Sequence, residues 1–207
     1  MLSPITVFYS VRGSFAYLGQ QEIARLARQY GRPLLHKPML LSIVVPETGG
    51  IWFTDRHPAR VRHAWDDFQR WAAWRNVPVV PEDPKNHYGP MELPSGLVVA
   101  AQKSVNAGGK GDLDRLAFEI LAALWRDDRD IADPAVLDEL AGTCGFDGPA
   151  LREVALGEAA QSEVVANSRE AVDLGVIGSP SYLVEGELFY GQDRLHFVEA
   201  ALKRSAA

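Results

Sequence analysis

The amino-acid sequence predicts an α/β fold in which the two ends of the chain together build one four-stranded sheet. Residues 5–38 follow a strand–helix–strand pattern, and residues 181–203 follow a hairpin–helix pattern. About 120 residues between them are mostly helical. Neither end forms a stable sheet alone, so the two ends are expected to pair.

The N-terminal unit begins with a short apolar run. Ile5–Tyr9 is rich in β-branched and aromatic residues, which is typical of a buried strand. Ser14 is a candidate N-cap for a helix that runs to about Tyr30, because apolar residues then recur at i, i+3, i+4 and i+7. Gly31 can end this helix. Leu34–Pro38 is then expected to be the second strand of a right-handed βαβ unit.

The middle of the chain predicts a helical insertion. The residues that follow the second strand, 39–56, are expected to form an irregular loop that contains Gly49-Gly50. The strongest helical pattern is Leu113–Trp125, where leucine, isoleucine and alanine form one stripe. Asp133-Pro134 places a cap and a first-turn proline in the order that starts a helix. Further helices are predicted over residues 58–76, 94–107, 149–156 and 158–174.

The C-terminal unit begins where Gly178-Ser179-Pro180 breaks the last helix of the insertion. Pro180 has no N–H to donate to a strand ladder, so another reason must place it at a strand entrance. A cis Ser179–Pro180 peptide is one reason, and it would leave the backbone groups of Ser179 free to pair with an extended ligand. A trans proline in an ordinary turn is the alternative. The hairpin then turns at Gly186, and residues 194–203 form the last helix.

A βαβ…ββα order with a proline before the hairpin is typical of the thioredoxin fold. The expected thioredoxin-like domain is discontinuous and comprises residues 1–40 and 175–207. The expected helical insertion domain comprises residues 41–174. It should cover the sheet edge where Gly13, Ser14 and Pro180 converge.

Composition narrows the function classes. The chain has 207 residues, a net charge of −6 and scattered basic residues, which argues against a nucleic-acid surface. It shows no secretory leader and no membrane span, so a cytoplasmic location is expected. The single cysteine, Cys144, excludes an internal disulfide and is expected to be a small buried apolar residue. The histidines follow no metal-binding spacing, and we expect no metal.

Three stretches resemble a known family. Residues 175–195 closely resemble the corresponding stretch of 2-hydroxychromene-2-carboxylate isomerases, which belong with kappa-class glutathione transferases in the DsbA-like branch of the thioredoxin superfamily. Residues 8–18 and 67–72 are weaker matches, and the resemblance extends over nearly the whole chain. It favours the cis form of Pro180. It also implies glutathione as cofactor and a homodimer.

The resemblance implies how glutathione would bind. The backbone of Ser179, before Pro180, would pair with the cysteinyl unit. Gln192 and Asp193 would hold the γ-glutamyl end, where the carboxylate of Asp193 can pair with the ammonium group. Free N–H groups at the following helix start can receive the γ-glutamyl carboxylate. Asp193 as a plain helix cap is the alternative.

The chain departs from the family at the catalytic position. The family usually shows Ser-Pro-aromatic-Ser/Ala, whereas this chain has Gly13-Ser14-Phe15-Ala16. The first serine of that motif, which stabilises the glutathione thiolate, therefore aligns with Gly13. Ser14 could supply the hydroxyl after a one-residue shift, the helix N-terminus could act without a hydroxyl, or the chemistry is lost. Arg12 could also lower a thiol pKa through its charge.

Aromatic residues of the insertion suggest a substrate pocket. Trp52-Phe53 lies in the expected loop and is the candidate wall that faces Pro180. Such a wall suits an aromatic or bicyclic acid, whose carboxylate could pair with Arg12, Lys37 or Arg60. No Cys-x-x-Cys motif is present, which argues strongly against a disulfide oxidoreductase.

These observations predict a glutathione-dependent isomerase of aromatic-compound catabolism, with the glutathione thiolate as nucleophile. A glutathione transferase that conjugates small electrophiles is the first alternative. A non-catalytic thiol-binding protein is the second, because Gly13 replaces the catalytic serine. A thioredoxin-like interaction module without a thiol ligand is the third.

Overall fold

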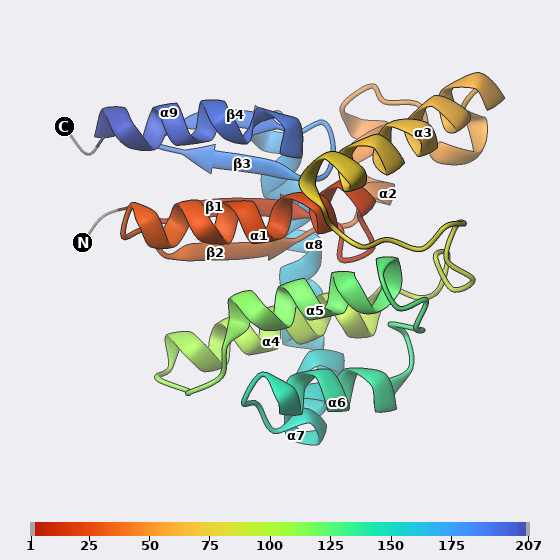
Figure 1. Ribbon diagram of the computed structural model, residues 1–207. Helices are drawn as coiled ribbons and strands as arrows, with labels where there is room; N and C mark the ends of the chain where they lie inside the picture. The colour runs from red at the N-terminus through yellow and green to blue at the C-terminus, as the bar shows by residue number, and fades with distance from the viewer. Residues whose placement is uncertain (1–2, 206–207) are drawn as a thin grey trace.

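The computed structural model describes residues 3–205, which contain one mixed four-stranded sheet (Figure 1). The strands are β1 (Ile5–Tyr9), β2 (Leu34–Pro38), β3 (Ser181–Val184) and β4 (Glu187–Tyr190). Their order is β2-β1-β3-β4, with β1 parallel to β2 and antiparallel to β3. The N-terminal and C-terminal units therefore pair, and the predicted thioredoxin-like sheet is confirmed.

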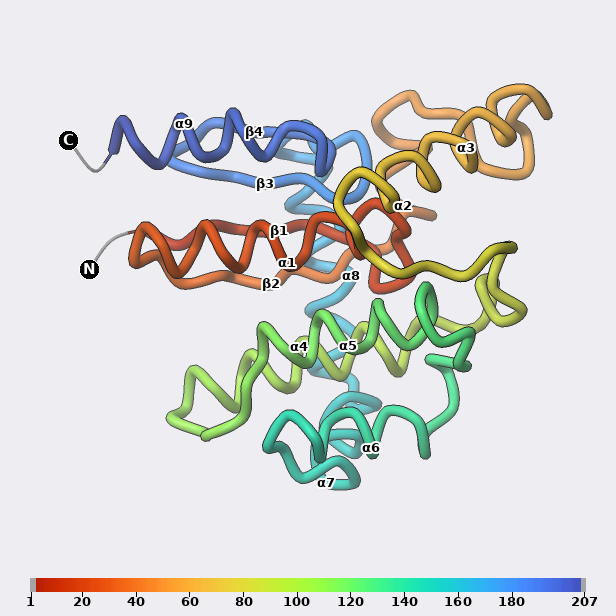
Figure 2. The backbone as a smooth tube through the Cα atoms, in the orientation of Figure 1, coloured from red at the N-terminus to blue at the C-terminus, as the bar shows by residue number. Residues whose placement is uncertain are grey.

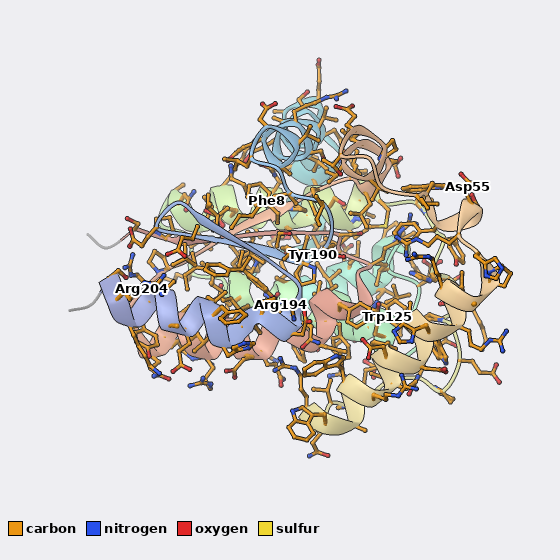
Figure 3. All side chains as sticks on the ribbon, turned by 90° about the horizontal axis from the view of Figure 1, so that it is seen from above. Phe8, Asp55, Trp125, Tyr190, Arg194 and Arg204 are labelled. Carbon is orange, nitrogen blue, oxygen red and sulfur yellow. The ribbon has the colours of Figure 1, made fainter. Side chains whose placement is uncertain are left out.

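Helices cover both faces of the sheet. Figure 3 shows α1 (Ser14–Gln29) and α9 (Leu195–Ser205) on one face, with α2 (Leu41–Glu47) and α8 (Glu158–Asp173) on the other. Strand β1 packs against the helices on both faces because its successive side chains point to opposite sides of the sheet. Its odd-numbered residues join the main core with α1, whereas Phe8 packs in a second cluster with α2 and α8.

Helices α4 (Glu92–Asn106), α5 (Leu113–Trp125), α6 (Pro134–Thr143) and α7 (Gly148–Leu156) stack beyond the β2 edge, as the tube in Figure 2 makes clear. Helix α3 (Pro58–Arg75) lies at the right-hand end of the sheet in that view and contacts α1. Helix α4 packs against β2, and α5 packs against α1. Their starts are set locally, because the side chains of Asp112, Asp133 and Asp147 accept hydrogen bonds from backbone N–H groups of the first turns of α5, α6 and α7. The domain boundaries at residues 40 and 174 stay predictions.

The predicted loop over residues 39–56 is wrong in part. The structure has helix α2 at Leu41–Glu47 and a short 3-10 helix, η1, at Phe53–Asp55. The helix is only seven residues long and contains Pro46, so its local sequence gives a weak signal. Val44 and Val45 are buried, and tertiary packing stabilises the helix.

Two helix starts also differ from the prediction. The N-cap of α1 is Gly13 and not Ser14, which is the first helical residue. The C-terminal helix α9 begins at Leu195, after a 3-10 turn, η2, at Gln192–Arg194. Asp193 therefore lies within this turn and not at the N-cap, which is Gly191.

Cys144 follows α6 and is free and buried, as predicted. Burial raises the pKa of its thiol. Within residues 3–205, no helix is long and apolar enough to cross a membrane. The same residues contain no group of three or more His, Cys, Asp or Glu side chains placed to hold a metal ion.

Tyr17 of α1 is a buried phenol whose ionisation would lower the stability of the fold at alkaline pH. Its hydroxyl donates to the carbonyl of Pro78 at 2.8 Å, and its ring stacks on Phe118 of α5 at a centroid distance of 5.7 Å. Burial raises the pKa of Tyr17 to about 12. The phenol of the unfolded chain ionises near pH 10, so stability is retained below pH 10 and is lost as the pH rises toward 12.

We therefore expect Tyr17→Phe to flatten the alkaline loss of stability. Urea denaturation at pH 8 and pH 11 should show a fall in the free energy of unfolding that is roughly 1 kcal/mol smaller in the variant than in the parent. At pH 8 the variant should be about 1 kcal/mol less stable, because the hydrogen bond to Pro78 is lost. An equal fall in both proteins would contradict this assignment.

Candidate functional site

Three loops meet at the carboxyl end of β1, at the right-hand end of the sheet in Figure 1. They are residues 10–13 before α1, residues 178–180 before β3 and residues 191–194 after β4. The backbone N–H of Ser10 donates to the Oγ atom of Ser179 at 3.0 Å. The N–H of Gly191 donates to the carbonyl of Pro180 at 2.9 Å. The loop before β3 is thus hydrogen-bonded to each of the other two.

The Ser179–Pro180 peptide is cis, as the resemblance favoured. Ser179 is half-buried, and its side chain lies directly beside Gly13. A Cβ atom added to Gly13 would lie 2.9 Å from Ser179 Oγ and 3.0 Å from the carbonyl oxygen of Ser10. Glycine therefore fits position 13 when Ser179 adopts this rotamer, and a larger residue there would displace the Ser179 hydroxyl.

The start of α1 has no side-chain cap, since its N-cap residue is Gly13. The N–H groups of the first helical turn have no partner within the helix, and they favour negative charge nearby. Ser14 is the first helical residue and is half-buried. The N-terminus of α1 can therefore donate hydrogen bonds to an anion, even though residue 13 carries no hydroxyl.

Arg12 precedes this turn and is held by carbonyl groups. Its Nη1 atom donates to the carbonyl oxygens of His87 and Gly89, each at 3.3 Å. Burial lowers the pKa of Arg12, but the guanidinium remains charged at neutral pH. Among the described residues it forms no ion pair with a carboxylate. Its positive charge is therefore not neutralised by direct contact.

His87 and Trp125 support Arg12 from the insertion. The indole N–H of Trp125 donates to the backbone carbonyl of Arg12 at 3.0 Å, and the rings of His87 and Trp125 are 4.8 Å apart. Burial, opposed by the carboxylate of Asp83 and aided by the charge of Arg12, lowers the pKa of His87. The helical insertion thus fixes the loop that carries Arg12 and Gly13.

Gln192 is buried in the third loop and is held by Arg75 at the end of α3. Arg75 Nε donates to Gln192 Oε1 at 2.6 Å, and Arg75 Nη2 donates to the Gln192 carbonyl at 2.9 Å. The Nε2 amide of Gln192 has no hydrogen-bond partner among residues 3–205. The next residue, Asp193, pairs with Arg194 and is about one-third exposed. This loop therefore combines an unused donor with an accessible carboxylate.

Residues 4–203 match the family model described as the DSBA-like thioredoxin domain. The chain belongs to the DSBA-like thioredoxin family. It is also distantly homologous to curated proteins over nearly its full length. It is 25% identical over 205 residues to 2-hydroxychromene-2-carboxylate isomerase from Sphingobium xenophagum, covering 98% of this chain and 99% of that protein. It is 23% identical over 204 residues to the isomerase of the same name from Pseudomonas putida, covering 97% and 94% of the two chains.

Solved structures agree with the DSBA-like fold. A 2-hydroxychromene-2-carboxylate isomerase superposes with a TM-score of 0.80 at 22% identity, covering 97% of this chain and 95% of that chain. The cytosolic disulfide reductase DsbM from Pseudomonas aeruginosa, solved with GSH, superposes with a TM-score of 0.65 at 20% identity. That match covers 99% of this chain and 98% of DsbM.

This DSBA-like chain carries no thiol at the site. Gly13 and Ala16 stand where a Cys-x-x-Cys motif would begin and end, and the single cysteine is Cys144. Cys144 is buried, beside Thr143 at the end of α6. A thiol that reacts at the junction of the three loops must therefore come from a bound molecule.

The predicted pocket wall lies at η1. The rings of Trp52 and Phe53 are 5.0 Å apart, and the guanidinium of Arg56 lies 4.3 Å from the Phe53 ring centre. Both aromatic residues are half-buried. In Figure 3, the neighbouring Asp55 lies well to one side of Tyr190 and Arg194. The role of Trp52 and Phe53 as a substrate wall stays a prediction.

A cleft of about 880 Å³ lies elsewhere, between α1, the end of α3 and the start of α5. Charged and apolar residues line it together, and Arg75 borders it. Arg75 thus lies between this cleft and Gln192. Sequence reasoning missed Arg75, because the ion-dipole contact joins residues 117 positions apart and no local motif marks it.

Proposed function

We propose that this DSBA-like protein is a glutathione-dependent isomerase that acts on a small aromatic or bicyclic acid. Full-length homology to 2-hydroxychromene-2-carboxylate isomerases supports the reaction class. The observation that carries the proposal is the unpartnered Gln192 amide beside Asp193, on the loop bonded to cis Pro180. Bound there, glutathione would supply a thiol nucleophile that adds to an electrophilic carbon and later leaves, so no other cofactor is needed.

The residues fit the γ-glutamyl end of glutathione, which carries one carboxylate and one ammonium group. Gln192 Nε2 can donate to the carboxylate, and Asp193 can accept from the ammonium. An unpartnered buried amide costs about 1–3 kcal/mol, so a ligand that supplies an acceptor would remove this cost. Arg75 donates to the oxygen of the same carboxamide and so fixes the direction of its Nε2 amide.

Arg12 is the best placed cation for a substrate carboxylate. Lys37 is already paired with Glu170, whereas within residues 3–205 Arg12 is bonded only to carbonyl oxygens. Arg12 also directly precedes the turn at Gly13, where the reacting thiol is proposed to lie. It would therefore orient an acidic substrate beside that thiol. Trp52 and Phe53 remain the proposed apolar wall.

A non-catalytic thiol-binding protein is the second candidate. The observation that favours it is Gly13, which offers no hydroxyl at the start of α1. A transferase that conjugates small electrophiles would use the same binding residues. A cytoplasmic location, where reduced glutathione is available, and a homodimer complete the proposal.

Calorimetric titration with glutathione tests the binding site. We expect binding at millimolar concentration or below, and we expect Asp193→Ala to weaken it roughly tenfold or more, because a charge-assisted hydrogen bond is lost. Arg194→Ala is the matched control, since it frees Asp193 from its ion pair and should leave affinity equal or higher. No binding by the folded protein would sink the proposal. Unchanged affinity in Asp193→Ala would place the γ-glutamyl end elsewhere.

An isomerisation assay with 2-hydroxychromene-2-carboxylate tests the reaction. Turnover is expected only when glutathione is present, and Arg12→Ala should raise KM because it removes the cation proposed to hold the substrate carboxylate. Glutathione binding without turnover of this or related bicyclic acids would favour the non-catalytic candidate.

A further inference from the structure

A hydroxyl from another loop lies close to position 13, where the sequence lacks one. Ser179 Oγ lies 2.9 Å from the point that a Cβ atom of residue 13 would occupy. We propose that the Ser179 side chain is the catalytic hydrogen-bond donor to the reacting thiolate, in place of a serine at the start of α1. This inference rests on the proposed glutathione site, and it gives Ser179 a role beyond its backbone.

The hydrogen bonding of Ser179 suits this role. A hydroxyl has one proton to donate and two lone pairs that accept. Ser179 Oγ accepts the N–H of Ser10 at 3.0 Å, which leaves its own proton for a ligand. An accepted hydrogen bond polarises a hydroxyl and strengthens it as a donor. The N–H of Ser10 also fixes the rotamer, so the hydroxyl is positioned before a ligand arrives.

Its surroundings suit a thiolate as well. Ser179 is half-buried, so a ligand can reach it while part of the solvent is excluded. Gly13 has no side chain that would separate Ser179 from the first turn of α1. The donors of that turn and the Ser179 hydroxyl can then act on one anion.

Ser14 is the competing donor, and the geometry argues against it. Ser14 is one residue further along α1, which turns its side chain by about 100° around the helix axis from position 13. The residue whose Cβ would adjoin Ser179 is Gly13. Gly13 is the N-cap and Ser14 is the first helical residue, which argues against the one-residue shift of the turn that the sequence alone allowed.

The same geometry makes the two serine positions exclusive. Gly13→Ser would bring its Cβ to 2.9 Å from Ser179 Oγ, so one of the hydroxyls must move. Gly13→Ser combined with Ser179→Ala removes this conflict and moves the hydroxyl to the other loop. No covalent step is involved: the bound thiol releases its proton to solvent, and Ser179 keeps its own proton while donating it as a hydrogen bond.

The thiol pKa of bound glutathione tests the inference and can be read from thiolate absorbance near 240 nm without any turnover. In the parent protein this pKa should lie below that of free glutathione. Ser179→Ala should raise it by about one unit, a tenfold loss of thiolate at a given pH. Gly13→Ser/Ser179→Ala should recover most of the lost thiolate, whereas Ser14→Ala should leave the pKa unchanged.

Binding of S-methylglutathione, which has no ionisable thiol, tests the glutathione site separately from the role of the Ser179 hydroxyl. Equal affinity for it in parent and Ser179→Ala shows that the site is intact, so a changed thiol pKa then reports the hydroxyl alone. If the parent binds neither ligand, the proposed function fails. If it binds both, three results would each overturn the role of Ser179 and leave the proposed function standing. They are an unperturbed thiol pKa in the parent, an unchanged thiol pKa in Ser179→Ala, and a raised thiol pKa in Ser14→Ala.

Discussion

Trp125→Ala is expected to lower the free energy of unfolding by about 3–5 kcal/mol, the cost typical of removing a fully buried aromatic side chain. Trp125 is 2% exposed at the end of α5. Its ring packs against Phe68 at a centroid distance of 5.0 Å and against His87 at 4.8 Å. Truncation leaves a cavity between these rings on the side of the molecule where α3 lies (Figure 3).

The same change should reach the candidate site. The indole N–H of Trp125 donates to the carbonyl of Arg12, which is one residue before Gly13. Without it, this carbonyl loses its partner and the loop before α1 is less constrained. We therefore expect weaker glutathione binding in any Trp125 variant that lacks the N–H, including those that remain folded at the temperature of the measurement.

Urea denaturation of three tryptophan variants checks this prediction. Trp125→Phe keeps an aromatic ring but not the donor, so its cost should lie well below that of Trp125→Ala. Trp74→Ala is the matched surface control, because Trp74 is 83% exposed and its loss should change stability by no more than about 0.5 kcal/mol. If Trp125→Ala is no more destabilising than Trp74→Ala, the packing described for α5 is incorrect.

Gly96→Ala is expected to destabilise the protein by about 1–3 kcal/mol, although alanine normally stabilises a helix relative to glycine. Gly96 lies within α4, where a Cβ atom would be 2.2 Å from the carbonyl oxygen of Ala155 in α7. It would also be 2.6 Å from Gln161 Nε2. The Ala155 oxygen belongs to the backbone, so the two helices would have to move apart.

Gly142→Ala is the matched control with the opposite expected sign. Gly142 is exposed in the last turn of α6, and a Cβ atom there would meet nothing within 4 Å. The change should therefore raise stability by up to about 1 kcal/mol through helix propensity. Thermal unfolding of both variants gives the comparison. A stabilised Gly96→Ala protein would mean that α4 and α7 do not approach as closely as described.

Local sequence was sufficient for most of the fold. Strand and helix periodicity, the Asp133 cap and the hairpin glycine act between residues a few positions apart, so the order of elements could be predicted from them. Helix α2 was missed because packing of Val44 and Val45, and not local propensity, stabilises it. Ser14 was misplaced as a cap for a related reason: glycine and serine are both common caps, and only the chain path selects Gly13.

What the sequence by itself determined is the DSBA-like architecture and the residues that surround its first and last loops. Tertiary structure alone decided which atoms of these loops meet. Arg75 reaches Gln192 across 117 positions, and Ser179 reaches Ser10 across 169. Such contacts depend on closure of the sheet between the two chain ends, and no local pattern encodes their geometry. For that reason the sequence directed attention to Ser14, whereas the structure places the Ser179 hydroxyl beside Gly13.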